Sequence, residues 1–500
     1  MSQSVLAGFD IGTSKIRCIL YNIHGKILIS YDHKTPIIRK KDGFYNPTEQ
    51  LYLISLKILK KIFNFSNKKN LIVRGIAFSS VGEAGVPIDI NRKALMDIIP
   101  WYDQRTEINR NKFLKKINSN MIFKHTGLNN DHFYSAFKLL WIKKNKKKIY
   151  SKIYKWLPVN DYIAMRLTEN ISTDYSQAMR TLLFDPKKMN WSSKMISLLE
   201  LKKSILPEIL NAGEKKGVFT KKIKKYLSIN YDCIVGVGGH DHFVGIFGLG
   251  GFNKSTAVNS LGSAEAISIN TEKYHADYVL HKSKFISGVF KTKYKSNYYV
   301  VGSILTSGLI IEWFMKNFKI KTYKELNFIL KNAKGVEKDI FVFPQFEYSH
   351  SPINSFKTKG LISGLNRSTS DGDIYKSILE CLSFDTKNAM DFIIKYTNTK
   401  VKKFICSGGS AKNKEWIKIK SNIIDKKIFV DRNSENVSLG SAILAGLACN
   451  IYLNEKDAFN KINNKFFIIN KNSKKVSSYK RSYKKYVSSI KKITELNNFA

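Results

Sequence analysis

A chain of 500 residues, of which 43% are hydrophobic, is long enough to form two or three domains with cores of their own. Its 84 lysines and arginines exceed its 39 aspartates and glutamates, and the net charge of +45 is typical of proteins that bind nucleic acid or anionic membranes. However, the basic residues are spread along the whole chain, as A/T-biased coding would produce, and no nucleic-acid-binding motif accompanies them, so solvated surface charge is favoured.

The sequence also predicts where the protein acts. No apolar run approaches the roughly 18–20 residues of a membrane-spanning helix, and the opening MSQSVLAGFD lacks the basic and cleavage segments of a signal peptide. The cysteines show no metal-ligand spacing, which predicts buried free thiols in a reducing cytosol. They are Cys18, Cys233, Cys381, Cys406 and Cys449. We therefore expect a cytoplasmic protein that does not act at a membrane.

The first ninety residues predict the order strand, strand, strand, helix, strand. The strands are expected at 5–9, 16–21, 26–32 and 71–79. The helix begins around Thr48, a candidate N-cap that follows a proline, and its apolar residues recur at helical spacing. The segment 110–230 reads as mostly helical.

The second half of the chain repeats the strand, bend and strand pattern that is predicted near the N-terminus. A strand at 233–241 is followed by the stretch 255–270, in which two apolar runs flank a bend. Alternating helices and strands follow, and the last segment, YKRSYKKYVSSIKKI, carries tyrosine, valine and isoleucine on one face of a helix that should dock on the core. The duplication predicts two related α/β domains, 1–250 and 251–500, with a cleft between them.

An acid and two hydroxyls meet at the first bend. Asp10 ends the first strand, and Gly12, Thr13 and Ser14 form the turn to the second. Backbone N–H groups and hydroxyls in such a turn bind anions without adding charge. An acid would repel a phosphate unless Mg²⁺ bridges the two, usually through water. The bend therefore predicts a Mg-nucleotide site, although the same residues also occur in ordinary turns.

Two later elements offer similar donors. The bend LGSAEA holds Gly262 and Ser263, and the stretch ICSGGSAKNKEW leads from a strand into a helix. In that stretch two adjacent glycines would let a flat ring lie against the backbone, and the polar side chains after them would bond to it. These residues are Gly408, Gly409, Ser410 and Asn413. Taken alone, a glycine pair fits a plain strand-to-helix turn equally well.

An ordered set of segments from residue 5 to about residue 452 resembles the FGGY carbohydrate kinases, which include xylulokinases, gluconokinases and glycerol kinases. FDIGTSKIR resembles the first phosphate loop of the family, NSLGSAE the second, and WYDQRT its Trp-x-Asp-x-Arg element. The segments at 161–185 and 360–380 resemble its two signatures. The resemblance implies an α/β fold of two actin/hexokinase-like (ribonuclease H-like) domains with an interdomain catalytic cleft.

The resemblance also implies roles for individual residues. Asp241, after an apolar strand and two glycines, is expected at a strand end as the base that accepts the hydroxyl proton, although it also fits a helix N-cap. Arg17 and Gly308 lie where relatives have residues near the nucleotide, and Arg17 also fits a plain surface charge. Gly409 and Asn413 match adenine-side residues.

The substrate side is expected in the loop 78–89, where Glu83 would accept hydrogen bonds from substrate hydroxyls or would be an exposed loop acid. The remaining substrate-side residues that the resemblance implies are Gly82, Trp101, Asp103, His240 and Asp241. Phe133 stands where glycerol kinases have a substrate-contacting tyrosine, and EYSHSP at 347–352 departs from the Glu-Arg-Thr-Pro seen in many relatives. These departures argue against a plain glycerol kinase and leave the substrate class open. A ketose, polyol or sugar acid of about four to six carbons would fit.

The predicted function is the phosphorylation of a hydroxyl group of a small sugar, sugar alcohol or sugar acid, with ATP and Mg²⁺ as cofactors. Two alternatives stay open, a non-catalytic sugar-binding relative of the same fold and a basic nucleic-acid-associated protein. The expected partners are therefore the carbohydrate and ATP, with no specific nucleic acid, and a homodimer stays open.

Overall fold

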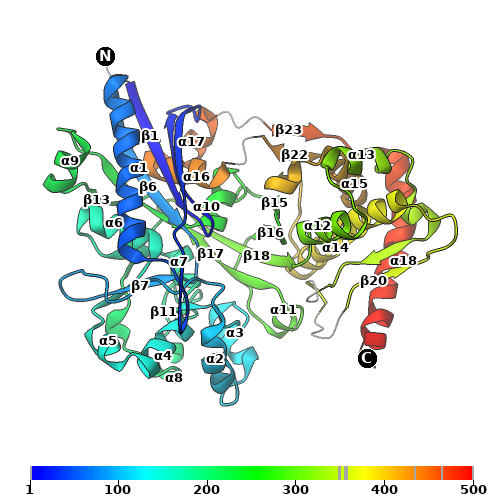
Figure 1. Ribbon diagram of the computed structural model, residues 1–500, viewed down its shortest axis with the longest axis horizontal. Coiled ribbons are helices and arrows are strands. Elements are labelled where there is room, and N and C mark those ends of the chain that lie inside the picture. Colours follow the sequence, from blue (N-terminus) through cyan, green and yellow to red (C-terminus); the bar gives the residue numbers. More distant parts are fainter. Residues whose placement is uncertain (1–2, 347–350, 354–358, 433–434, 463–465, 498–500) are drawn as a thin grey trace. The chain divides into compact units, whose positions relative to one another are not determined.

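The computed structural model describes residues 3–497 apart from 347–350, 354–358, 433–434 and 463–465 (Figure 1). The described chain divides into two compact units of α and β structure. Unit 1 comprises Met1–Phe252, Gly288–Tyr298 and Glu435–Asn464, and unit 2 comprises Asn253–Ser287, Tyr299–Ser434 and Lys465–Ala500.

A six-stranded mixed sheet forms the centre of unit 1. Its strand order is β13-β14-β6-β1-β2-β3. The bounds are β1 Gln3–Ile11, β2 Lys15–Asn22, β3 Ile27–Lys34, β6 Leu71–Ser80, β13 Lys215–Val218 and β14 Ile234–His240. Strands β1, β6 and β14 run parallel to one another, so their carboxyl ends meet at one edge of the sheet.

One helix packs against strands β2, β3 and β6 of this sheet. Helix α1, Thr48–Lys68, buries an apolar stripe that includes Leu59 and Phe63. The N-cap position is Pro47, which has no side-chain donor or acceptor, so the prediction that Thr48 caps the helix is wrong. The Thr48 amide instead donates to Oδ1 of Asp97 at 3.1 Å, a long-range partner that local sequence does not reveal.

Helix α16, Asn436–Ala448, comes from the C-terminal part of the chain and packs on β1, β6 and β14 and beside α10, Asp241–Gly248 (Figure 1). Small residues permit this approach. A Cβ atom added at Gly8 would lie 1.8 Å from the carbonyl oxygen of Ser438, and one at Gly440 would lie 2.1 Å from that of Val244. The helix can therefore approach the sheet and α10 only where these side chains are missing.

The segments Gly288–Tyr298 and Glu435–Asn464 thus belong to unit 1, whereas the sequence assigns all of 251–500 to a second domain. The physical reason is the apolar surface of α16, whose residues from Ser438 to Leu447 are all buried. The domain boundary at residue 250 stays a prediction.

The rest of unit 1 consists of short strands and helices around the sheet. The strands are β4 Ile38–Lys40, β5 Gly43–Tyr45, β7 Gly85–Ile88, β8 Lys155–Pro158, β9 Ser172–Asp174, β10 Phe184–Asp185, β11 Asn190–Trp191 and β12 Glu208–Leu210. The α-helices are α2 Glu107–Leu114, α3 Ser119–Thr126, α4 Ser135–Asn145, α5 Lys147–Lys152, α6 Val159–Thr168, α7 Tyr175–Met179, α8 Ser193–Leu198, α9 Lys221–Leu227 and α17 Glu455–Lys461.

Unit 2 is built on a seven-stranded sheet with the order β17-β18-β16-β15-β21-β22-β23. The bounds are β15 Thr256–Leu261, β16 Glu265–Thr271, β17 Ile286–Lys291, β18 Ser296–Ile304, β21 Lys403–Ser407, β22 Ile428–Asp431 and β23 Phe466–Ile469; a separate pair comprises β19 Phe341–Phe343 and β20 Leu361–Ser363. The helices are α11 Tyr278–Lys282, α12 Gly308–Asn317, α13 Tyr323–Leu330, α14 Asp371–Thr397, α15 Lys414–Ile424 and α18 Ser473–Asn497.

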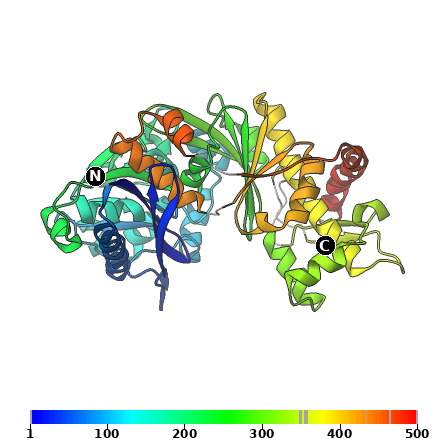
Figure 2. The same cartoon turned by 90° about the horizontal axis from the view of Figure 1, so that it is seen from above.

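Helix α18, red in Figure 2, packs against α14 and α15 as the sequence predicts. Its tyrosines combine apolar burial with hydrogen bonds to carboxylates of α14, so the helix is held by polar as well as apolar contacts. The pairs are Tyr479 with Glu380 at 2.7 Å, Tyr483 with Asp391 at 3.2 Å and Tyr486 with Asp385 at 3.0 Å.

The five cysteines are free thiols, as predicted, and all are buried except the partly exposed Cys449. Within the part of the chain that the structure describes, none of the helices is both long and apolar enough to cross a membrane.

Candidate active site

Two carboxylates lie at the carboxyl edge of the unit 1 sheet. Asp10 is near the end of β1, and Asp241 begins α10 directly after β14. The end of β6 separates them, because Asp10 pairs in register with Ser79 and His240 pairs with Ser80. The structure therefore brings together two acids that are 231 positions apart in the sequence.

The surroundings of this pair favour protonation or a cation. Burial raises the pKa of Asp10 to about 7, although the Ser79 hydroxyl, which donates to Oδ1 at 3.3 Å, lowers it. Burial and then the charge of Asp10 raise the pKa of Asp241 well above its usual range. Mg²⁺ takes one or two carboxylates and keeps waters and phosphate oxygens as its other ligands, so this donor set fits it. Among the described residues, no group of three or more His, Cys, Asp or Glu side chains forms a fuller metal site.

The turn between β1 and β2 is held from several sides. The Gly12 amide donates to the carbonyl of Lys15 at 2.9 Å, which closes the turn. Thr35 donates through its hydroxyl to the Gly12 carbonyl at 2.8 Å and through its amide to the Ser14 carbonyl at 3.0 Å. Outside the turn, the Trp101 indole donates to the Thr13 hydroxyl at 2.9 Å. The loop is therefore fixed by contacts with two distant segments.

Arg17, predicted to lie near the nucleotide, points to two acids. Its guanidinium donates to the Glu435 carboxylate and, at 3.2 Å, to Oδ2 of Asp32. The arginine thereby joins β2 to the start of α16. Its role toward a nucleotide stays a prediction.

A second ion pair lies beside Asp241. Arg180 donates through Nε to Oε1 of Glu83 at 2.6 Å, and both side chains are nearly buried. Glu83 has a φ of 63°, a conformation that non-glycine residues seldom adopt and that is found at functional sites. The charges of both residues act on the pKa of Asp241, Glu83 raising it and Arg180 lowering it.

Gly82 and His240 complete this cluster. A Cβ atom at Gly82 would lie 2.9 Å from both Arg180 Cγ and His240 Cδ2, so only glycine fits between them. His240 Nε2 is 3.2 Å from Oδ1 of Asp241. Burial lowers the pKa of His240 well below its usual range, so the ring is neutral at physiological pH. The sequence predicts a role for all of these residues except Arg180, which lies within the segment 161–185 that resembles a family signature.

The carboxylate of Asp103 is fully engaged within the protein. Oδ1 accepts from the amide and Nε of Arg105, and Oδ2 accepts from Nη2 of Arg105 and the amide of Phe44, all within 3.0 Å. Burial opposes ionisation, but these bonds lower the pKa of Asp103. Because its acceptor positions are occupied, the structure gives Asp103 a local scaffolding role, and its contact with substrate stays a prediction.

The Trp101 ring packs edge-on against Tyr102 and Phe133, at centroid distances of 5.7 and 6.3 Å. It is 39% exposed and can thus contact a ligand. The unusual EYSHSP stretch cannot be compared, because 347–350 lie outside the described residues.

In unit 2, the bend between β15 and β16 is hydrogen-bonded to the start of α12. The amides of Ser307 and Gly308 donate to the carbonyls of Ser263 and Gly262, each at 3.1 Å. A Cβ atom at Gly308 would lie 2.6 Å from the Gly262 carbonyl oxygen, so the glycine is needed for this close approach.

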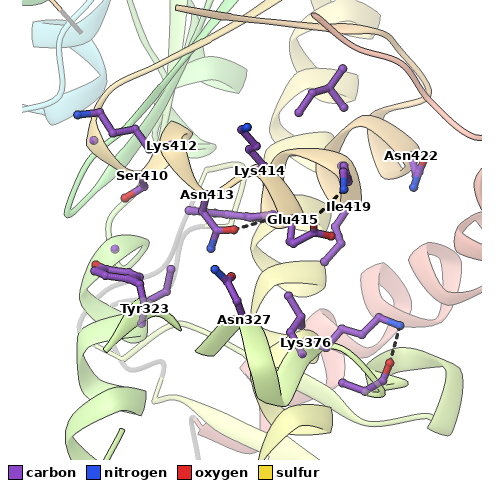
Figure 3. Close-up of a pocket in the computed structure, with 18 of the residues that line it drawn as sticks. Tyr323, Asn327, Lys376, Ser410, Lys412, Asn413, Lys414, Glu415, Ile419 and Asn422 are labelled. Carbon is purple, nitrogen blue, oxygen red and sulfur yellow. Dashed lines mark hydrogen bonds and ion pairs between the residues drawn. The ribbon is translucent and has the colours of Figure 1, made fainter. Parts of the chain in front are cut away.

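This bend opens on a cavity of 1560 Å³ that lies wholly within unit 2 (Figure 3). Most of the predicted nucleotide residues of unit 2 line it, namely Gly262, Ser263, Gly308, Gly409, Ser410 and Asn413. Asn413 caps α15 and points toward Asn327 of α13 across the cavity (Figure 3). The sequence analysis missed Tyr323 and Asn327, because nothing local relates α13 to the glycine-rich turn.

Gly408 and Gly409 differ in their surroundings. Gly408 has a φ of 96°, and a Cβ atom there would lie 2.4 Å from the carbonyl oxygen of Leu261, so this glycine shapes the turn. A Cβ atom at Gly409 would meet nothing within 4 Å, so its backbone faces open space, as a site for a flat ring requires.

A buried ion pair stabilises the bend between β15 and β16. Glu265, at the start of β16, accepts from Lys420 of α15 at 2.5 Å, and both side chains are fully buried. Thr386 also donates to this carboxylate, and Ser307 donates to its other oxygen at 3.2 Å. The bend is thus tied to three helical segments by one carboxylate.

Known proteins share both the sequence pattern and the fold. Residues 5–248 match the N-terminal domain, and residues 257–449 the C-terminal domain, of the FGGY family of carbohydrate kinases. The chain is 26% identical over 491 residues to the xylulose kinase of Staphylococcus xylosus, covering 96% of this chain and 99% of that protein.

Solved structures share the fold at lower identity. The gluconate kinase of Lactobacillus acidophilus superposes with a TM-score of 0.89 at 20% identity, covering 99% of each chain. The Plasmodium falciparum glycerol kinase, determined with ADP, superposes with a TM-score of 0.88 at 24% identity, covering 98% of each chain. The two domain matches together span most of the sequence. They show that this chain belongs to the FGGY family of carbohydrate kinases, which transfer phosphate from ATP to a carbohydrate hydroxyl.

Proposed function

We propose that this kinase phosphorylates a neutral ketose or polyol of about four to six carbons, with ketopentoses as the first candidates. The observation that carries this proposal is the Glu83–Arg180 pair beside Asp241. A sugar acid would require a cation free to meet its carboxylate, whereas the charge of Arg180 is already balanced by Glu83. Sequence relatives named xylulose kinase add support.

Each residue of the cluster has a role in this proposal. Asp241 accepts the proton of the attacking hydroxyl, since it emerges at the strand end and burial raises its pKa, which strengthens it as a base. Glu83 has one carboxylate oxygen bonded to Arg180 and presents the other to a substrate hydroxyl. Arg180 fixes Glu83, and the Trp101 ring forms a wall for the carbon chain.

The nucleotide side uses both phosphate bends. The backbone and hydroxyls of Thr13, Ser14 and Ser263 are the proposed donors to phosphate oxygens, and the turn at Gly409 with Asn413 is the proposed seat of the adenine. Mg²⁺ would be held by Asp10, directly or through water, and would neutralise phosphate charge. A cytoplasmic location and a homodimer stay predictions.

A screen of ADP release with about twenty candidate acceptors tests the substrate class. The panel contains pentuloses, hexuloses, polyols, glycerol and sugar acids, each with Mg-ATP. We expect the highest kcat/KM with a neutral ketose or polyol. A sugar acid or glycerol as the preferred substrate would contradict the proposal.

Changing Asp10 to alanine should raise the Mg²⁺ concentration needed for half-maximal ADP release and weaken the use of Mg-ATP, because a carboxylate ligand is lost. The sugar KM should change less. Mg²⁺ titrations at fixed ATP measure this effect. Asp232→Ala, an exposed acid paired with Lys224 at 2.7 Å, is the matched control. An unchanged titration for Asp10→Ala would remove Asp10 from the metal site.

Changing Glu83 to alanine should lower kcat/KM for the sugar. The loss should correspond to about 1–3 kcal/mol of activation free energy, since substrate hydroxyls and Arg180 lose their partner. ADP release without sugar should hardly change. Glu49→Ala, which removes a surface pair with Arg166, is the matched control. Equal losses with and without sugar would show that Glu83 supports the fold and does not contact the substrate.

A further inference from the structure

A single hydrogen bond links the proposed sugar wall to the proposed phosphate loop. The Trp101 indole N–H lies 2.9 Å from the Thr13 hydroxyl oxygen. An indole can only donate, so Thr13 must accept, and its own proton is directed elsewhere. In the described part of the chain, the Thr13 hydroxyl has no acceptor for that proton.

The geometry around this bond keeps it in place. The Trp101 ring is held edge-on by Tyr102 and Phe133. On the other side, Thr35 fixes the carbonyls of Gly12 and Ser14, the two neighbours of Thr13. Both partners are therefore positioned by contacts of their own, and the bond between them orients the Thr13 hydroxyl.

We propose that Trp101 is a positioning residue for the phosphate loop, which orients the Thr13 hydroxyl as a donor to a phosphate oxygen of the nucleotide. This inference rests on the proposed function. The same ring forms the proposed sugar wall, so one residue contributes to both proposed binding sites.

A double-mutant cycle tests the link. Affinity for Mg-ATP is measured by calorimetry without sugar for the wild type, Thr13→Val, Trp101→Phe and the double variant. Thr13→Val should weaken binding about tenfold, because it removes one hydrogen bond to a charged group. Trp101→Phe should weaken binding about three- to tenfold, and the double variant should bind no more weakly than Thr13→Val.

Two controls separate orientation from general damage. Thr13→Ser keeps the hydroxyl and should bind within about twofold of the wild type and retain sensitivity to Trp101→Phe. Trp191→Phe removes another buried indole bond, to the Pro207 carbonyl at 2.8 Å, and should leave Mg-ATP affinity unchanged.

Independent effects, in which the two losses multiply in the double variant, would overturn the proposal, and so would normal affinity in Trp101→Phe. The titrations contain no sugar, so an error in the proposed substrate class does not affect them. Conversely, the acceptor screen can fail while the cycle still shows the coupling.

Discussion

Replacement of Asp241 by asparagine is expected to lower kcat at least about 100-fold while Mg-ATP still binds. The amide cannot accept the hydroxyl proton as the sugar oxygen attacks the phosphate. Asparagine retains Oδ1, which accepts from the His242 amide at 2.6 Å, so the start of α10 should be preserved. The measurement combines steady-state ADP release with calorimetric titration of Mg-ATP.

Asp232→Asn provides the matched acid-to-amide control, since that side chain is 61% exposed and outside the cluster around Asp241. It should retain wild-type turnover. If Asp241→Asn phosphorylates the sugar at a rate close to that of the wild type, another group accepts the proton and the assignment of Asp241 is wrong.

Replacement of Lys420 by methionine is expected to lower the free energy of unfolding of unit 2 by about 3–5 kcal/mol. Methionine replaces the aliphatic part of lysine but leaves the Glu265 carboxylate buried without its cation. Glu265 follows the bend at Gly262 and Ser263, so the loss should also weaken ADP binding. Urea unfolding with and without ADP measures both effects.

Two further variants test whether the loss of stability comes from the unpaired charge of Glu265. Lys418→Met removes an exposed lysine that pairs with Glu415 at 2.7 Å and should cost less than about 1 kcal/mol. Adding Glu265→Gln to Lys420→Met should restore part of the stability, because it removes the unpaired charge. A loss below about 1 kcal/mol for Lys420→Met would show that Glu265 does not depend on this cation.

The fold could be predicted where local sequence carries the signal. The buried strand β14 was visible as an apolar run, and α14 as a long helical pattern that the structure shows to begin at a capping box of Ser370 and Asp373. The cap of α1 by Asp97 and the placement of α16 in unit 1 were not predictable, because both depend on contacts between segments far apart in the chain.

The candidate site divides in the same way. Asp10, Asp241 and the glycine-rich bends follow strands directly, so their place at a sheet edge can be read from the sequence. Arg180 and Lys420 could not be identified, since their partners Glu83 and Glu265 lie 97 and 155 positions away. For such ion pairs, the sequence shows two charges but not that they meet.

The position of α16 has a consequence for the synthesis of the protein. The sheet strands β1, β6 and β14 leave the ribosome long before Asn436–Ala448, the helix that packs on them. At 5–20 residues per second, roughly 20–70 s separate the end of β6 from the end of α16. During that interval part of an apolar sheet lacks its cover, so the nascent chain is open to chaperones. A gene cut after residue 252 would likewise encode an N-terminal fragment that lacks this helix and the segment Gly288–Tyr298, and a separately expressed peptide containing Asn436–Ala448 would supply only the helix.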